Sequence, residues 1–309
     1  MTAKPIKLGI VGVGKIVRDQ HLPALAANPA YSLAAAASRN GRVEQIPNFT
    51  TIEAMLEAVP DLDAVSLCMP PQFRYEAART ALAAKKHVFL EKPPGATVSE
   101  VENLKAYAAA QGVSLFASWH SRYAPAVEAA RSFLAGTRIR SAAINWKEDV
   151  RRWHPNQDWI WQPGGLGVFD PGINALSIAT HILPAMFITA ATLEFPENRA
   201  SPIAAKIDFR TADGFAVTAD FDWRQTGPQS WDILAETDAG SMLLSGGGAK
   251  LSIDGKIVHD GQEAEYPMLY RRFAELVLAG ASDVDLAPLQ HVADAFMLGR
   301  RTVVEAFHD

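Results

Sequence analysis

The 309-residue chain has almost no cysteine: Cys68 is the only one, so no disulfide can form within the chain. Cys68 stands in the apolar run Ala64–Met69, where a thiol serves as a small core side chain. The histidines lack HxxxH and HxH spacing, and one cysteine cannot complete a ligand set with them. We therefore expect neither a disulfide framework nor a metal site.

The sequence also lacks long apolar runs and an excess of positive charge. No uninterrupted apolar run reaches the roughly 18 residues that a membrane helix needs. A first strand is expected by Ile6, which leaves no room for a signal peptide. Lys and Arg total 29 against 34 Asp and Glu, a net charge of −5 that offers no general field for nucleic acid. We expect a cytoplasmic protein with no membrane or nucleic-acid partner.

The length favours two domains, and the first third of the chain alternates strand and helix signals. Such alternation is typical of a parallel sheet with crossover helices. The expected strands are Ile6–Val11, Tyr31–Ala37, Ala64–Met69, His87–Leu90 and Val113–Ala117. The expected helices are Lys15–Ala27, Ile52–Ala58, Gln72–Ala84 and Ser99–Gln111. The pattern predicts an α/β domain over residues 1–122.

From about residue 139 the hydrophobic period changes from that of helices to that of strands. The expected strands are Ile139–Val150, Thr189–Phe195, Ala204–Arg210, Ala216–Trp223, Ile233–Glu236, Ser241–Leu244 and Lys250–Ile253. Thr211–Gly214 is expected to form a tight hairpin, and Leu289–Phe307 a final helix. Residues 123–309 are therefore predicted to form an α+β domain with a largely antiparallel sheet.

A glycine-rich segment, Gly9-Ile10-Val11-Gly12-Val13-Gly14-Lys15-Ile16-Val17, follows the first strand and opens a helix. This context is the one a dinucleotide fingerprint requires, with Gly12 permitting the tight turn and Gly14 a close approach of the pyrophosphate. Free N–H groups at the helix start favour an anion there. Val17 replaces the usual third small residue, and an ordinary glycine turn is the alternative. The segment predicts a Rossmann domain with Gly12, Gly14, Lys15 and Ile16 at the cofactor.

The second expected strand ends at Ala37 and is followed by Ser38-Arg39. NAD-specific folds usually place an acid near this point to bind the ribose 2′-hydroxyl. No acid is present here, whereas a hydroxyl and a guanidinium suit a 2′-phosphate. We therefore expect NADP to be preferred, with NAD tolerated. A solvated loop arginine is the alternative.

Two further strand ends carry candidate cofactor residues. Met69-Pro70 stands at the end of one strand and Glu91-Lys92-Pro93 follows the next, at the sheet edge where ligands bind in open α/β folds. A lysine there can hydrogen-bond a reacting hydroxyl. Out of context, Glu-Lys-Pro is only a turn.

Together, the glycine segment, the Cys-Met-Pro-Pro strand end and Glu91-Lys92-Pro93 resemble the Gfo/Idh/MocA family of oxidoreductases over almost the whole chain. The resemblance implies that the lysine of Glu-Lys-Pro contacts cofactor and substrate, which makes Lys92 a catalytic candidate. It also implies a homo-oligomer, because family members pair through the open face of the second-domain sheet.

The family's second signature is Asp-x-Gly-x-His at the start of a helix, which corresponds here to Asp170-Pro171-Gly172-Ile173-Asn174. Asn174 replaces the histidine, so the usual histidine acid–base scheme is in doubt, although an amide can still hold a hydroxyl. Asp170 and Asn174 are four apart and can point to one side of the helix. The structural alternative makes Asp170 an N-cap followed by Pro171 at the first helical position.

The asparagine, with Trp119-His120, Trp146-Lys147-Glu148 and Trp153-His154, resembles a subgroup of aldose 1-dehydrogenases acting on L-arabinose and D-galactose. Sugar sites combine an aromatic platform with several polar groups. The substrate-binding candidates are His120, Glu148, Trp153, His154 and Asn174. Each of these residues also has a purely structural alternative. Glu148 would be a strand residue facing water, His120 and His154 would be loop histidines with hydrogen-bond partners, and Trp153 would be a packing residue.

The resemblance implies oxidation of the anomeric C1 hydroxyl of a pyranose to an aldonolactone, with hydride passing to the nicotinamide. Lys92 and Asp170 are the candidate proton acceptors, and Asn174 would fix the hydroxyl. Three alternatives stay open: another sugar or cyclitol dehydrogenase of the family, a biliverdin-reductase-like enzyme, and a non-catalytic sugar sensor. The sensor should lack the Glu-Lys-Pro lysine, which this sequence keeps.

Overall fold

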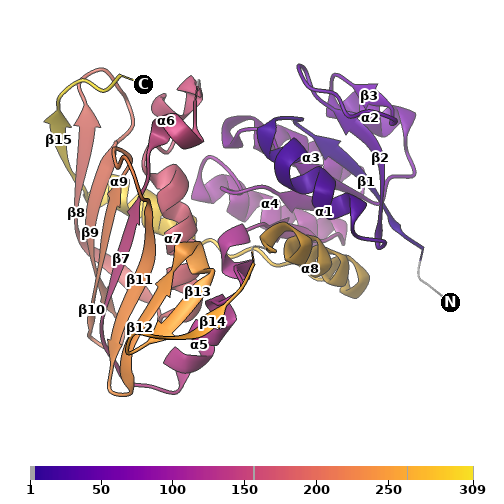
Figure 1. Ribbon diagram of the computed structural model, residues 1–309. Coiled ribbons are helices and arrows are strands. Elements are labelled where there is room, and N and C mark those ends of the chain that lie inside the picture. The colour runs from indigo at the N-terminus through magenta and orange to yellow at the C-terminus, as the bar shows by residue number, and fades with distance from the viewer. Residues whose placement is uncertain (1–3, 156, 263, 309) are drawn as a thin grey trace. The chain divides into compact units, whose positions relative to one another are not determined.

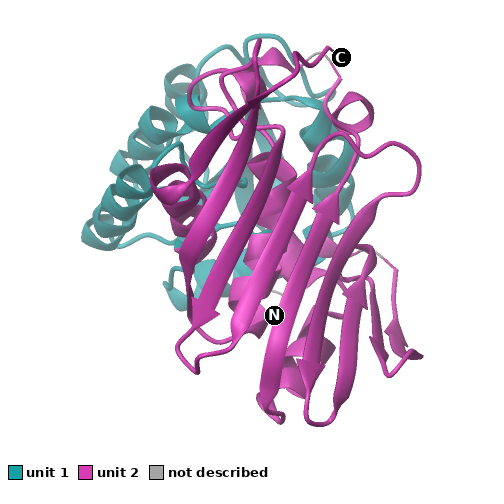
Figure 2. Cartoon of the chain, turned by 90° about the vertical axis from the view of Figure 1, so that its left-hand side faces the viewer, with its two compact units in different colours: residues 1–120, 266–286 teal, residues 121–265, 287–309 magenta. Residues whose placement is uncertain are grey.

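The computed structural model describes residues 4–155, 157–262 and 264–308. The chain separates into two compact units (Figure 2): Met1–His120 with Tyr266–Leu286, and Ser121–Glu265 with Ala287–Asp309. The first crossing lies close to the expected boundary at residues 122 and 123. A single domain boundary nevertheless does not account for Tyr266–Leu286, which belongs to the first unit.

The first unit is built on a six-stranded sheet in the order β3-β2-β1-β4-β5-β6, with parallel neighbours throughout. This strand order is that of the doubly wound Rossmann fold. The strands are β1 (Ile6–Val11), β2 (Tyr31–Ala37), β3 (Asn48–Phe49), β4 (Ala64–Leu67), β5 (His87–Leu90) and β6 (Leu115–Ala117). The helices are η1 (Val17–His21), α1 (Leu22–Ala26), α2 (Ile52–Ala58), η2 (Pro71–Phe73), α3 (Arg74–Ala83), α4 (Val98–Gln111) and α8 (Glu265–Ala279).

Helices cover both faces of this sheet, and alternation along the strands decides which side chain meets which helix. Val88 and Leu90 of β5 enter the core that also holds residues of α2, α3 and α4. Phe89 points to the other face, where its ring centroid lies 5.1 Å from that of Tyr270 and 5.6 Å from that of Phe273, both on α8. Burial of such aromatic side chains, each worth about 1.5–3 kcal/mol, explains why α8 belongs to the first unit.

The second unit is built on a nine-stranded sheet in the order β14-β13-β12-β11-β7-β10-β9-β8-β15. The pairs β10–β7 and β15–β8 are parallel and the others antiparallel, so the predicted fold class is confirmed. The strands are β7 (Ile139–Lys147), β8 (Met186–Pro196), β9 (Ala204–Thr211), β10 (Ala216–Asp222), β11 (Ser230–Thr237), β12 (Gly240–Ser245), β13 (Lys250–Ile253), β14 (Lys256–Asp260) and β15 (Arg300–Val304). The hairpin predicted at Thr211–Gly214 joins β9 and β10.

The remaining helical segments are η3 (His120–Tyr123), α5 (Val127–Ala135), α6 (Val150–Trp153), η4 (Asp158–Trp161), α7 (Phe169–Ile182), η5 (Gly246–Gly248) and α9 (Ala287–Leu298). Within the second unit, α5, α7 and α9 lie on one face of its sheet (Figure 1). Gly172 lets α7 approach the sheet closely, because a Cβ there would lie 2.9 Å from the Phe221 ring. On the opposite face of β9, Lys206, Asp208 and Arg210 are exposed. In the described ranges, no helix is both long and apolar enough to cross a bilayer.

The predicted final helix Leu289–Phe307 is wrong in its second half. Helix α9 ends at Leu298, and β15 then pairs in parallel with β8 at the edge of the sheet. Gly299 marks the break, since a Cβ there would lie 2.4 Å from the Ala295 carbonyl oxygen. The β-branched run Thr302-Val303-Val304 that follows favours a strand over a helix.

Candidate functional site

The glycine turn after β1 is shaped by its contact with the neighbouring strand end. Gly12 has a φ of 87°, and a Cβ there would lie 2.6 Å from the Met69 backbone nitrogen, so only glycine fits. Gly14 is open, because no atom beyond Gly14 itself and its two chain neighbours lies within 4 Å of the position its Cβ would take. Lys15 and Ile16 are exposed at the start of the following helix. The turn therefore leaves backbone accessible at a helix start, as an anion site requires.

Ser38 and Arg39 lie directly beyond the end of β2. The Ser38 hydroxyl accepts a hydrogen bond from the Gly41 N–H at 3.2 Å, and the Ser38 N–H donates to Phe49 at 2.9 Å. Arg39 is exposed, and its guanidinium makes no hydrogen bond or ion pair with the part of the chain that the structure describes. An ordered loop thus carries an exposed cation beside the glycine turn.

The Glu91-Lys92-Pro93 turn follows β5, and a buried arginine donates hydrogen bonds to its backbone. Arg74, at the start of α3, is 2% exposed and donates to the carbonyl oxygens of Glu91, Pro93 and Met69. Burial lowers the pKa of Arg74 to about 10 even though Glu91 and Cys68 favour its charged form. The guanidinium therefore ties two strand ends of the predicted cofactor edge together.

Glu91 is itself buried, and its carboxylate lies in a network of aromatic and imidazole groups. Its Oε1 accepts from the Tyr266 hydroxyl at 2.6 Å and lies 3.2 Å from His21 Nε2, while Oε2 accepts from the Lys92 N–H at 2.6 Å. Burial alone would raise the pKa of Glu91, but His21, His120 and Tyr266 lower it to about 2. Burial opposes the charge of His21, yet contacts with Cys68, Tyr270 and Glu91 raise the pKa of His21 well above its usual value.

His120, predicted to bind substrate, lies beside this network. Its ring stacks on that of Tyr266, with centroids 5.7 Å apart and planes 22° apart. The adjacent Trp119 is 2% exposed, and its indole N–H donates to the Asp285 carbonyl oxygen at 2.9 Å. In the first unit the structure therefore brings together Glu91, Lys92 and His120 through Tyr266.

In the second unit Asp170 and His154 form a pair, with Asp170 Oδ2 3.3 Å from His154 Nε2. Asp170 is 4% exposed and lies inside the first turn of α7. The N-cap interpretation is wrong: Val168 is the N-cap, and the Asp170 N–H already bonds to the Gly167 carbonyl oxygen at 2.8 Å. Asn174, one turn later on α7, is partly exposed.

Glu148 lies just after β7 and is held by two indoles. Trp223 Nε1 donates to its Oε1 at 3.2 Å, and Trp231 Nε1 donates to its Oε2 at 2.9 Å. The side chain is 6% exposed, so the interpretation of a strand residue facing water is wrong. Trp153 is 39% exposed and packs against Trp231 with ring centroids 5.6 Å apart. The His154 ring lies 5.2 Å from that of Trp223.

Sequence reasoning missed several members of these two clusters, namely His21, Arg74, Tyr266, Tyr270, Trp223 and Trp231. The apolar spacing of Tyr266, Leu269, Tyr270 and Phe273 on α8 is a helical signal that could have drawn attention to the tyrosines. Nothing in the sequence marks Trp223 and Trp231 as partners of a carboxylate. Among the described residues, no group of three or more His, Cys, Asp or Glu side chains is placed to hold a metal ion.

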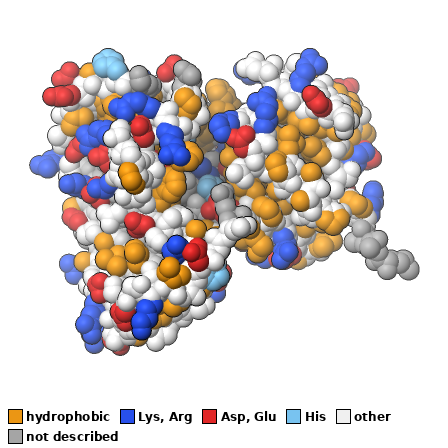
Figure 3. Space-filling model, in the orientation of Figure 1, with side chains coloured by type: hydrophobic (Ala, Val, Ile, Leu, Met, Phe, Trp, Pro, Cys, Tyr) orange, Lys and Arg blue, Asp and Glu red, His pale blue; other side chains and the backbone are white. Residues whose placement is uncertain are grey.

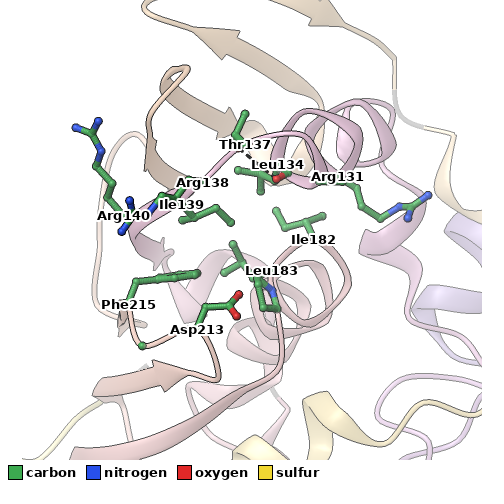
Figure 4. A pocket seen from close by; sticks show the side chains of 13 residues that line it. Arg131, Leu134, Thr137, Arg138, Ile139, Arg140, Ile182, Leu183, Asp213 and Phe215 are labelled. Carbon is green, nitrogen blue, oxygen red and sulfur yellow. Dashed lines mark hydrogen bonds between the residues drawn. The ribbon is translucent and has the colours of Figure 1, made fainter.

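A hollow of about 850 Å³ lies elsewhere in the second unit, between the end of α5, the end of α7 and the β9–β10 hairpin (Figure 4). It is lined by Arg131, Leu134, Ala135, Thr137, Arg138, Ile139, Arg140, Ile182, Leu183, Pro184, Asp213, Gly214 and Phe215. None of the predicted site residues lines it. On the face seen in Figure 3, acidic and basic side chains are interspersed rather than gathered in a basic stripe.

Comparison with known proteins gives a family and several relatives. Residues 6–118 match the family described as "Oxidoreductase family, NAD-binding Rossmann fold". Galactose 1-dehydrogenase from Pseudomonas fluorescens is 46% identical over 307 residues, covering 99% of this chain and all of that protein. Trans-1,2-dihydrobenzene-1,2-diol dehydrogenase from Mus musculus is 31% identical over 191 residues, covering 58% of this chain and 57% of that protein.

Solved structures agree with this assignment. The crystal structure of a D-galactose-1-dehydrogenase protein from Rhizobium etli has a TM-score of 0.97 and 71% identity, covering 100% of this chain and 99% of that one. A 3-ketoreductase from Actinomadura kijaniata, with a TM-score of 0.84, 22% identity and coverage of 97% and 100%, shares the fold. With its glycine turn, its strand order and a relative that matches nearly end to end, the chain belongs to the Gfo/Idh/MocA family of oxidoreductases, which has an NAD-binding Rossmann fold.

Proposed function

We propose that the protein is an NAD(P)-dependent aldose 1-dehydrogenase that oxidises C1 of a pyranose to the aldonolactone, with D-galactose and L-arabinose as substrates. The observation that carries the proposal is the polar cluster of the second unit, in which Glu148 and His154 lie against indole rings and Asp170 pairs with His154. Carboxylates and an imidazole beside aromatic rings suit the hydroxyls and C–H faces of a sugar. The two galactose dehydrogenase relatives support the same substrate class.

The residues at the sheet edge of the first unit fit a dinucleotide. The open position beside Gly14 leaves room for a pyrophosphate at the helix start, near Lys15 and Ile16. Gly12 lies against the Met69 backbone, and Pro70 follows Met69 at the same edge of the sheet. Ser38 and Arg39 follow β2, where an exposed guanidinium suits a 2′-phosphate, so NADP is preferred and NAD also accepted. When bound, the nicotinamide would accept the hydride released from C1.

The candidate substrate-binding residues would make different kinds of contact with the sugar. The Glu148 carboxylate, fixed by two indole N–H groups, accepts hydrogen bonds from sugar hydroxyls. Trp153, partly exposed, offers a ring face to the C–H groups of the pyranose. His120 and His154 bind further hydroxyls, and Asn174 holds the C1 hydroxyl through its amide. The first two groups are already oriented by their neighbours, which lowers the entropy cost of binding.

The C1 hydroxyl must lose its proton as the C1–H bond breaks and the C=O bond forms. Lys92 and Asp170 are the candidate acceptors. The Glu91 carboxylate fixes the Lys92 backbone, and His154 lies against the Asp170 carboxylate. Asn174 has no titratable group near neutral pH, so it can orient the hydroxyl but cannot take the proton.

The two proposed sugars are related by a single difference. L-Arabinose and D-galactose share the configuration of ring carbons 1 to 4, and galactose adds a hydroxymethyl group at C5. A pocket that reads carbons 1 to 4 and leaves space at C5 accepts both. The test is a substrate panel of these sugars, D-glucose and a cyclitol, each with NADP and NAD, following absorbance of the reduced cofactor and identifying the lactone.

We expect turnover with D-galactose and L-arabinose, and weaker turnover with D-glucose, whose C4 hydroxyl has the opposite configuration. Turnover of the cyclitol alone would indicate a different dehydrogenase of the family. Binding of a sugar without reduction of either cofactor would indicate a sensor. Either result would refute the proposed activity.

A further inference from the structure

We propose that Tyr266, which no motif marks, is a positioning residue that holds both the Lys92 turn and the His120 ring. The inference rests on the proposed function, because it assigns Tyr266 to the support of Lys92 and His120. Tyr266 reaches the first unit from the C-terminal part of the chain, at the start of α8, and is 3% exposed. Its hydroxyl and its ring each make a different contact with the predicted site.

The hydroxyl contact leads to Lys92 through one carboxylate. Tyr266 donates to Glu91 Oε1 at 2.6 Å, and Glu91 Oε2 accepts from the Lys92 backbone N–H at 2.6 Å. The two oxygens belong to one planar group, so a rotation of the carboxylate that breaks one bond also displaces the other. Hydrogen bonds to a buried carboxylate are charge-assisted and well oriented. The hydroxyl thus fixes where the Lys92 backbone lies.

The ring contact leads to His120. The tyrosine ring stacks on the imidazole with planes only 22° apart and centroids 5.7 Å apart. This contact needs the aromatic ring and not the hydroxyl. Tyr266 therefore supports two candidate site residues through two chemically separable interactions. Its hydroxyl supports the Lys92 turn, and its ring supports His120.

His21 reinforces the same arrangement from the helix that follows the glycine turn. Its Nε2 lies 3.2 Å from Glu91 Oε1, the oxygen that Tyr266 also reaches, and its Nδ1 lies 2.7 Å from the Tyr270 hydroxyl. Tyr266 and Tyr270 are four residues apart, so both hydroxyls lie on one side of α8. The Glu91 carboxylate therefore lies between η1 and α8 and contacts a side chain of each.

The separable contacts define the experiment, which compares Tyr266→Phe with Tyr266→Leu in the full-length protein. Tyr266→Phe keeps the ring on His120 and removes the hydroxyl. We expect kcat to fall about 10- to 100-fold, as for small misplacements of reacting groups, with the KM for the sugar changed by less than about threefold. Tyr266→Leu also removes the ring, and we expect the same loss of kcat with an additional rise of about tenfold or more in the KM for the sugar.

Tyr31→Phe is the matched control. It removes a buried phenol hydroxyl that donates to the Tyr270 carbonyl oxygen at 2.8 Å in the same unit but does not touch Glu91. We expect it to lower thermal stability about as much as Tyr266→Phe and to leave kcat within about twofold. A similar loss of kcat in both variants would overturn the inference, because it would reflect loosened packing alone.

Lys92→Ala separates this inference from the function beneath it. Loss of turnover in Lys92→Ala with normal kcat in Tyr266→Phe refutes the positioning role and leaves the proposed function standing. Normal turnover in Lys92→Ala refutes the role of Lys92 and the positioning role with it. A fall in kcat in both variants, with the control unaffected, supports the inference.

Discussion

His154 Nε2 lies 3.3 Å from Asp170 Oδ2 within the second unit, and only 4% of Asp170 is exposed. The family signature has a histidine at the position of Asn174, so this chain lacks that imidazole. The Asp170 carboxylate nevertheless lies next to an imidazole, that of His154 on the loop after α6. A carboxylate next to an imidazole is an arrangement that can accept a proton and pass it on.

The first prediction tests Asp170 as a proton acceptor or relay. Asp170→Asn keeps the shape of the side chain but removes the carboxylate, so we expect kcat/KM to fall by about 100- to 10,000-fold, the usual worth of general acid–base help. Asn174→Ala loses only neutral hydrogen bonds and should cost about 1–3 kcal/mol in transition-state stabilisation. Kinetics on D-galactose and L-arabinose, with melting temperatures, give both values.

The same measurements separate catalysis from folding. Asp170 is not an N-cap, so neither variant is expected to remove a helix cap. An Asp170→Asn protein that is active and stable would show that the carboxylate plays no part in the chemistry. Lys92 would then be the remaining candidate for the base.

The second prediction concerns Lys92, whose backbone N–H is bonded to Glu91. Lys92→Ala should lower turnover severely while NADP affinity stays within about tenfold, a loss of no more than about 1.4 kcal/mol. Turnover is measured by cofactor absorbance and affinity by fluorescence titration of the variant. Near-normal turnover would remove Lys92 from the mechanism.

The third prediction concerns cofactor choice. Arg39→Ala should weaken NADP binding about tenfold to a hundredfold more than NAD binding, because a charge-assisted contact to the 2′-phosphate is worth about 1.5–3 kcal/mol. Arg42→Ala, an exposed arginine three residues later, is the control and should change neither affinity appreciably. Equal effects of Arg39→Ala on both cofactors would mean that Arg39 does not contact the phosphate.

The fourth prediction concerns the pH dependence of folding stability. Glu91 has a folded pKa of about 2, below its usual 4.5, so its stabilisation is fully present above pH 4.5 and is lost as pH falls toward 2. The pKa of His21 is raised above its usual 6.5, so its stabilisation is present below pH 6.5 and is lost as pH rises through the folded value. The contribution of this pair should therefore be greatest between these two usual values.

Urea unfolding across this range gives the measurement. In Glu91→Gln, the fall in the free energy of unfolding below pH 4.5 should become shallower than in the unmodified chain. A matched substitution at exposed Glu57 should leave the profile unchanged. If the free energy of unfolding fell as steeply below pH 4.5 in Glu91→Gln as in the unmodified chain, the pair of Glu91 and His21 would not determine stability in acid.

The fifth prediction concerns assembly. We expect two copies to pair through the open face of the nine-stranded sheet, where Lys206, Asp208 and Arg210 of β9 are exposed. Reversing two of these charges, in Lys206→Glu with Arg210→Glu, should then lower the sedimenting mass from that of a dimer to that of a monomer. A wild-type chain that sediments as a monomer at all concentrations would refute the expectation.

The local signals that the sequence carries are those set by short-range sterics and hydrophobic period. The turn at Gly12 and the hairpin after Thr211 need particular backbone conformations, and the strand end at Leu90 is set by a short apolar run, so these features could be read directly. The second half of the last helix could not, because the strand β15 gains its hydrogen bonds from β8, about a hundred residues earlier.

The sequence by itself determined the alternation of strands and helices in the first unit, the glycine turn, and the positions of Lys92, Asp170 and Asn174 as candidates. Only the tertiary structure decided what surrounds them: Tyr266 on Glu91, two tryptophans on Glu148, and His154 on Asp170. The physical reason is that these contacts join residues 16 to 175 positions apart, and a buried carboxylate is stabilised by whichever donors the folded chain brings to it.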